Sequence, residues 1–190
     1  ILNMPRQLSE KEKRIRDIVN PLKTAKWQAD YRWDRLERSL ERMGIDYGGL
    51  ELCPDYQRGH VWTRDQQVAF IEACLRGIVS TAGLFLQFNC ASWSESGEDS
   101  DLPPGLQCID GLQRYTAITE FCKGNVKPFG LSLEDLAETA YSPKQFHIKI
   151  AVHDFVKRSD LLKSYLSLNS GGTQHSASEI ERVRGLLSEC

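Results

Sequence analysis

The sequence lacks any apolar run that approaches the ~20 residues of a membrane span. It also shows no signal peptide. Its six cysteines form no Cys-x-x-Cys pair and no Cys/His cluster with the spacing of a zinc site. Most of them sit within apolar segments, a usage typical of a reducing compartment rather than of a disulfide framework. We therefore predict a cytoplasmic protein with no membrane partner.

Excess charge of either sign is also missing, since the formal net charge is -2. A dedicated non-specific DNA binder is usually basic, so the overall charge gives such a function no support, although a local basic patch stays open. Residues 23–38 hold one candidate, in which lysines and arginines alternate with Trp27, Tyr31 and Trp33. A basic-aromatic face can bind nucleic acid. We favour the alternative, a solvated helix whose aromatic rings pack on the core.

What is present is an ordinary globular composition, with 41% hydrophobic and 26% charged residues. The apolar periodicity and the capping signals predict short strands at 50–53, 83–89, 106–109 and 146–152. They predict helices at 8–20, 30–43, 63–76, 112–122, 131–140, 155–168 and 176–190. We expect an N-terminal helical arm over residues 1–29 and a compact α+β domain over residues 30–190. A small mixed sheet flanked by helices is expected in that domain.

The stretch Ile109–Arg114 combines the end of an apolar strand, an acid, a glycine and a helix start. Because the first N–H groups of a helix have no partner within it, this junction suits an anion such as phosphate. Asp110 offers a hard oxygen to Mg²⁺ or to a proton. Arg114 lies one turn into the helix, where a guanidinium can hold a phosphate with two hydrogen bonds. Taken alone, the stretch also fits a capping Asp110 and a surface ion pair of Arg114.

Two further polar loops contain glycine and stand beside a predicted helix start. Residues 56–62 offer aromatic rings, an amide and a guanidinium, which suit a base or ribose together with a phosphate. Residues 169–173 form a glycine-containing turn whose N–H groups can make an anion nest. We expect the loops to converge on one site. The predicted nucleotide-binding residues are Tyr56, Gln57, Arg58, Trp62, Gly111, Asn169, Gly171, Gly172 and Thr173.

These blocks, in this order, resemble a large bacterial and phage family that carries an Asp-Gly-Gln-Gln-Arg motif. Residues 54–66 resemble its first block, Ile109–Arg114 its signature, and residues 168–179, which end on Glu179, its closing block. The family has a ParB/sulfiredoxin-like fold. It includes the N-terminal half of GmrSD-type modification-dependent restriction enzymes and the SspE and BrxU defence nucleases. The three blocks together span most of the chain.

The resemblance implies nucleotide binding, often with nucleoside triphosphate (NTP) hydrolysis, coupled to DNA recognition or cleavage. It implies that Asp110 acts on Mg²⁺ or as a base, that Arg114 holds phosphate and that Gln113 orients water or phosphate. Gln57 and Arg58 would complete the phosphate cradle. We thus predict an NTP-binding domain with Mg²⁺-dependent phosphohydrolase or phosphotransferase activity in a restriction, defence or DNA-modification context. The expected partners are a nucleotide, DNA, and a separate nuclease domain or subunit.

One position departs from the family pattern, because Leu112 replaces the first glutamine of the signature. The loss of a polar group there favours an alternative function, a non-catalytic module that binds a nucleotide or modified DNA. A second alternative is a ParB-like DNA nuclease that acts alone. The negative net charge and the lack of a metal-ligand cluster in the sequence count against this nuclease. No His-Asn-His pattern is visible among the four histidines either.

Overall fold

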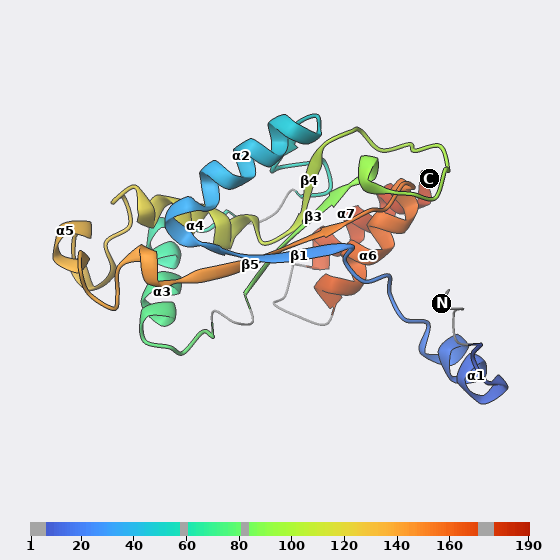
Figure 1. The fold of residues 1–190 in the computed structure, drawn as a ribbon, viewed down its shortest axis with the longest axis horizontal. Coiled ribbons are helices and arrows are strands. Elements are labelled where there is room, and N and C mark those ends of the chain that lie inside the picture. Colours follow the sequence, from blue (N-terminus) through green and yellow to red (C-terminus); the bar gives the residue numbers. More distant parts are fainter. Residues whose placement is uncertain (1–6, 58–60, 81–83, 171–176) are drawn as a thin grey trace, which may run out of the picture.

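The computed structural model describes residues 7–57, 61–80, 84–170 and 177–190, which fold around one five-stranded sheet (Figure 1). The strands lie in the order β1-β5-β3-β4-β2. Their bounds are β1 Trp27–Arg32, β2 Leu50–Glu51, β3 Phe85–Cys90, β4 Leu106–Asp110 and β5 His147–His153. β2 pairs parallel with β4 and β3 parallel with β5, whereas the other two pairings are antiparallel. The predicted α+β class with a small mixed sheet is thus confirmed.

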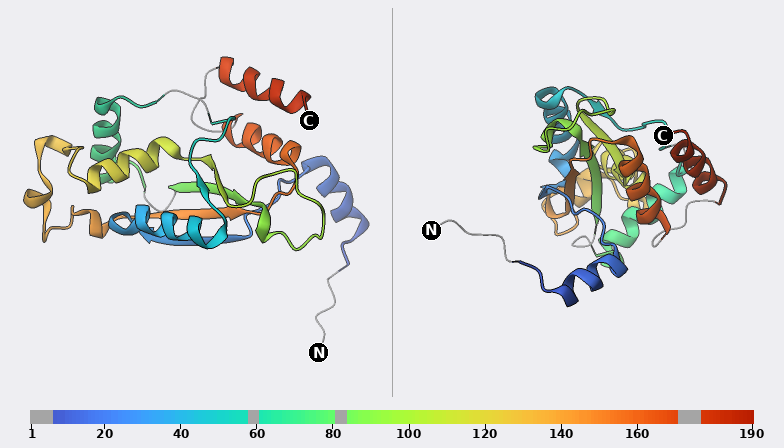
Figure 2. Two further views of the ribbon diagram at one scale, coloured as in Figure 1. Left: turned by 90° about the horizontal axis from the view of Figure 1, so that it is seen from above. Right: turned by 90° about the vertical axis from the view of Figure 1, so that its right-hand side faces the viewer.

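The described ranges also contain seven α-helices. Their bounds are α1 Glu10–Val19, α2 Leu36–Tyr47, α3 Arg64–Leu75, α4 Leu112–Cys122, α5 Leu133–Leu136, α6 Arg158–Ser170 and α7 Ala177–Ser188. Helices α6 and α7 lie together on one side of the sheet, and α2 lies on the other (Figure 2). The helix predicted at 131–140 is only the single turn α5, because a capping box at Ser132 starts it but Leu136 alone is buried within it.

The first strand corrects the predicted helix at 30–43, since residues 27–32 are extended. Trp27 pairs with Val152 and Arg32 with His147, so β1 forms an edge of the sheet next to β5. Half-buried Trp27, Ala29 and Tyr31 alternate along the strand with exposed Gln28 and Asp30, a period of two that a helix does not have. The sheet therefore begins inside the segment that we assigned to the N-terminal arm. The favoured interpretation of the basic-aromatic segment was therefore wrong about the helix. It was right about the packing, since Trp33 is buried and Trp27 and Tyr31 pack against the main core.

Helix α2 continues beyond its predicted end at Gly44 and is capped by Gly48, whose φ is +97°. A Cβ atom at position 44 would lie 2.7 Å from the Cβ of Leu50. Glycine at position 44 therefore allows α2 to pack closely against Leu50, the first residue of β2. This contact holds the start of β2, the strand that leads into the loop with Tyr56 and Gln57.

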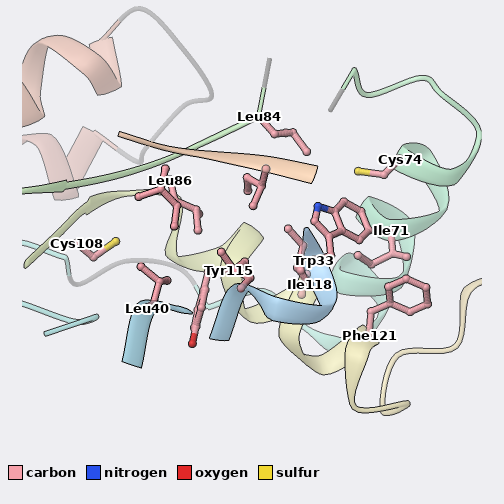
Figure 3. Packing of buried hydrophobic residues seen from close by; sticks show 14 of the residues in the cluster. Trp33, Leu40, Ile71, Cys74, Leu84, Leu86, Cys108, Tyr115, Ile118 and Phe121 are labelled. Carbon is pink, nitrogen blue, oxygen red and sulfur yellow. The ribbon is translucent and has the colours of Figure 1, made fainter. Parts of the chain in front are cut away.

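The main core fills the space between the sheet and helices α2, α3 and α4 (Figure 3). Trp33 is its largest member, and its ring stacks on Phe146 at 4.9 Å and meets the edge of Phe121 at 6.2 Å. The central strand β3 contributes Leu86 and Phe88, both fully buried. This burial agrees with the central position of β3 in the sheet.

A second, smaller core lies between β4 and helices α6 and α7. Ile109 of β4, Tyr165 of α6 and Val183 of α7 belong to it, and so does Tyr56 from the loop after β2. The ring centroids of Tyr56 and Tyr165 are 5.4 Å apart, with the planes at 64°. This second core therefore joins three elements that are distant in sequence, and it lies directly under the candidate site.

Helix α1 stands apart from the sheet and buries no residue (Figures 1 and 2). Its N-cap is Ser9, whose side chain accepts a hydrogen bond from the Glu12 N–H. The apolar residues Ile15, Ile18 and Val19 are exposed. Among the described residues, no helix is both long and apolar enough to cross a membrane.

His153 makes the stability of the fold dependent on pH. Its Nε2 lies 2.9 Å from Oε1 of Gln87, and its ring stacks on Phe155 at 5.5 Å. Desolvation by burial lowers the pKa of His153 below its ordinary 6.5, although the Asp154 carboxylate opposes this and Lys23 adds to it. The folded state therefore prefers the neutral ring. The corresponding stability is present above the unfolded pKa near 6.5 and is lost as the pH falls from there toward the folded pKa.

We expect the free energy of unfolding of the wild-type protein to fall more between pH 7.5 and pH 5.5 than that of His153→Gln. Urea titrations at both pH values measure the two differences. Carboxylates titrate alike in both proteins, so the variant removes only the histidine contribution. Equal decreases in the two proteins would show that His153 is not desolvated as described.

Candidate functional site

The candidate site lies at one edge of the sheet, where β2 and β4 both end. Because these neighbouring strands are parallel, their carboxyl ends meet at the same edge. Residues 52–57 follow β2, and Gly111 with α4 follows β4. Helix α6 returns toward this edge after β5, which runs antiparallel to β4. Topology therefore brings together the two predicted blocks around residues 56 and 110.

The junction between β4 and α4 has the predicted form of strand, tight turn and helix. Gly111 is the N-cap of α4 and adopts φ +103° and ψ 8°, a conformation that favours glycine. A Cβ atom here would lie 2.7 Å from Cδ2 of Leu86 and 3.0 Å from the carbonyl oxygen of Phe85. Glycine is thus required both by the backbone and by the close approach to β3. It also offers the helix no capping side chain. The N-terminal turn of a helix suits an anionic ligand.

Asp110 and Arg114 form an ion pair across the first turn of α4. The Nη2 atom of Arg114 lies 2.7 Å from Oδ2 of Asp110. Both side chains are 25% exposed, so each is held by the protein and still reachable from solvent. This ion pair also agrees with the simpler interpretation of the sequence, in which Arg114 forms a surface pair. Their position at an uncapped helix N-terminus is what distinguishes them from other pairs.

Two glutamine amides tie the loop after β2 and the start of α3 to this junction. Nε2 of Gln57 donates to the carbonyl oxygen of Ile109, and Sγ of Cys108 lies 3.8 Å from the same nitrogen. Oε1 of Gln113 accepts a hydrogen bond of 2.9 Å from the N–H of Trp62. Burial raises the pKa of the Cys108 thiol, with a further contribution from Asp110. The predicted first block and signature are therefore in direct contact.

The two aromatic residues of the first block support the site rather than line it. Tyr56 is fully buried, so its ring offers no stacking surface to a base in this structure. Trp62 is partly buried and packs on the main core, with its ring 5.2 Å from that of Phe70. A role for either ring in base stacking stays a prediction.

The closing block is only partly described. Arg58, Gly171, Gly172 and Thr173 lie outside the described residues, so their predicted roles have no structural test. Asn169 falls in the last turn of α6 rather than in the predicted glycine turn. Glu179, the acid of that block, is 7% exposed and lies at the start of α7.

Three residues of α6 and α7 that the sequence-based prediction left out of the site surround the 54–57 turn. Nη1 of Arg182 donates to the Asp55 carbonyl oxygen and its Nη2 to that of Tyr56, both at 2.7 Å. Nη2 of Arg158 donates to Oδ2 of Asp55 at 2.6 Å. Burial raises the pKa of Tyr165, and the carboxylate of Glu179 adds to this increase. These contacts join the turn to helices more than 100 residues away in the sequence, so no local spacing of residues predicts them.

The donor set can be compared with the requirement of Mg²⁺. Within the described ranges, no group of three or more histidine, cysteine or acidic residues converges on one point. Mg²⁺ often binds one or two carboxylates, with phosphate oxygens and water as its other ligands. Asp110 is a partly exposed carboxylate beside a helix N-terminus that suits phosphate. The residues present therefore fit a Mg²⁺ that arrives with a nucleotide.

Comparison with known proteins gives one family match. Residues 40–147 match the family model described as "GmrSD restriction endonuclease, N-terminal domain". This segment is more than half of the chain and includes β2 through to the start of β5, with both Gln57 and the Asp110–Arg114 pair. No curated protein and no solved structure matches the chain. The resemblance to the ParB/sulfiredoxin-like group stays a prediction.

Proposed function

Because the chain belongs to the family of GmrSD restriction endonuclease N-terminal domains, we propose that it binds an NTP and hydrolyses it with Mg²⁺ in the service of DNA restriction or defence. The family membership ties the chain to a DNA-related restriction context. The nucleotide and its hydrolysis are proposed from the site. A longer assembly that includes a nuclease domain or subunit is part of the same proposal.

The observation that carries the proposal is the Asp110–Arg114 pair at the uncapped N-terminus of α4. The dipole of α4 and the N–H groups of its first turn favour the phosphates of the nucleotide. Arg114 is close enough to exchange its bond to Asp110 for bonds to a phosphate oxygen. A guanidinium also offsets the charge that develops on the phosphoryl group during transfer.

In this proposal, a Mg²⁺ that arrives with the nucleotide would offset part of the charge on the phosphates. Asp110 either holds the metal or accepts the proton of the attacking water. The bond between that water oxygen and the terminal phosphorus forms as the bond to the nucleoside diphosphate breaks. Gln57 and Gln113 keep their amides on Ile109 and Trp62, so they fix the walls of the site.

The test is Mg²⁺-dependent release of phosphate from a panel of the four ribonucleoside triphosphates, together with calorimetric measurement of their binding. We expect Arg114→Lys to bind the preferred NTP about 10-fold more weakly, because lysine keeps the charge but loses the two-pronged contact. Arg32→Lys is the matched control, since Arg32 forms a similar pair with Asp34 away from the site. Absence of NTP binding by the wild-type protein would contradict the proposal.

A second candidate function is a binding module that does not hydrolyse the nucleotide. The observation that favours it is Leu112, whose side chain packs against the main core at the start of α4. The site thereby has no polar group at that position to orient water. Tight NTP binding without phosphate release by the wild-type protein would select this function over hydrolysis.

A further inference from the structure

We propose that Arg182 of α7 is a positioning residue for the nucleotide site, which it sets by holding the 54–57 turn. The inference rests on the proposed function. It adds a residue outside the segment of the chain that matches the family model, since that segment ends at residue 147.

The turn has few backbone contacts of its own. Within it, the N–H of Gln57 donates to the carbonyl oxygen of Pro54 at 2.8 Å. The strand before it, β2, contains only Leu50 and Glu51. The position of Gln57 relative to β4 therefore depends on side chains that reach the turn from elsewhere.

Arg182 supplies the most specific of these contacts. One guanidinium nitrogen holds the carbonyl oxygen of Asp55 and another holds that of Tyr56, each at 2.7 Å. Two parallel bonds from a planar guanidinium fix both the position and the orientation of a turn. Oε1 of the buried Glu179 lies 3.7 Å from Nη2 of Arg182, one turn earlier on α7. This carboxylate restrains the guanidinium in turn.

The consequence reaches the site through the residue that follows. Tyr56 packs on Tyr165 in the second core, to which Ile109 also belongs, and Gln57 next to it donates to the Ile109 carbonyl oxygen. Asp110 is the next residue along β4. Arg182 thus acts on the nucleotide site through the turn and Gln57, without a place at the phosphate itself. Loss of Arg182 should weaken nucleotide binding more than it slows the chemical step.

The experiment compares Arg182→Ala and Arg182→Lys with Arg184→Ala. Arg184 lies on the same helix, is exposed and forms an ion pair of 3.8 Å with the exposed Glu181, so it is the matched control. We expect the backbone amides of residues 53–57 to exchange hydrogen about tenfold faster in Arg182→Ala, with β4 unchanged. The KM for the preferred NTP should rise about tenfold while kcat changes little. Arg182→Lys, which can hold one carbonyl, should restore part of both properties.

Circular dichroism shows whether each variant folds. If Arg182→Ala does not fold, the hydrogen exchange and the KM of Arg182→Lys are compared with those of the wild type instead. Equal exchange at residues 53–57 in the wild type and in Arg182→Ala would overturn the inference, as would an equal effect of Arg184→Ala. A fall in kcat with constant KM would do the same. A wild-type protein that binds no NTP would overturn both the proposed function and this role. Wild-type binding with unaltered KM in both Arg182 variants would overturn this inference alone.

Discussion

Asp110→Asn is expected to lower Mg²⁺-dependent phosphate release by about 100-fold or more. The amide keeps the size of the side chain but loses the charge that holds a metal and the basicity that accepts a proton. The fold should survive, because the partner of Asp110 is a partly exposed Arg114 and such pairs contribute only about 1 kcal/mol or less. Steady-state phosphate release at saturating NTP measures the effect.

Asp34→Asn is the control for this substitution. Like Asp110, Asp34 is paired with an arginine, here through two hydrogen bonds from Arg32, and its side chain is 24% exposed. The pKa of Asp34 is lowered, mainly by the hydrogen bond from Arg32, so it is anionic at neutral pH as the comparison requires. We expect the control to hydrolyse at the wild-type rate. A rate for Asp110→Asn close to that of Asp34→Asn would exclude a chemical role for Asp110.

Gly111→Ala is expected to lower the free energy of unfolding by about 3 kcal/mol, from backbone strain and overpacking together. The strain arises from φ +103°, which a residue with a Cβ adopts poorly. The crowding arises from the side chain of Leu86 and the carbonyl oxygen of Phe85, neither of which can move without disturbing β3. Thermal and urea unfolding, followed by circular dichroism, measure the loss.

Gly77→Ala separates the two causes. Gly77 also has a positive φ, +74°, but an added Cβ would meet nothing within 4 Å. It should therefore cost only the backbone component, about 1 kcal/mol. Losses of equal size at both positions would mean that the close approach between Gly111 and β3 contributes nothing.

Much of the fold was predictable from sequence where short-range signals decide it. The β4–Gly111–α4 junction carries an apolar run, a glycine and a helical pattern within a few residues, and the structure has the predicted strand and helix there. The capping box of Thr63 and Gln66 likewise starts α3 as predicted. In both cases the sequence signal lies within the helix or strand that it predicts, so no distant contact is needed to recognise it.

The predictions from sequence were wrong or incomplete where the structure of a segment depends on a partner far away in the chain. Residues 27–32 became a strand because β5 offers an edge to pair with, and β5 lies far along the chain. Gly44 did not end α2, because its missing Cβ serves contact with Leu50. At the site, the sequence indicated Asp110 and Arg114 but not Arg182, whose two bonds to the 54–57 turn exist only after the chain has folded.

The pairing of β1 with β5 also sets the order in which the domain can form. During synthesis, β1 emerges first and has no partner until His147–Val152 have left the ribosome. The segment that contains β2, β4 and α4 is complete well before then, so the elements around Asp110 can assemble early. Until β5 arrives, the aromatic residues of β1 stay uncovered and prone to association with other chains. Folding of this domain should therefore be limited by closure of the longest loop in the sheet rather than by assembly of its site.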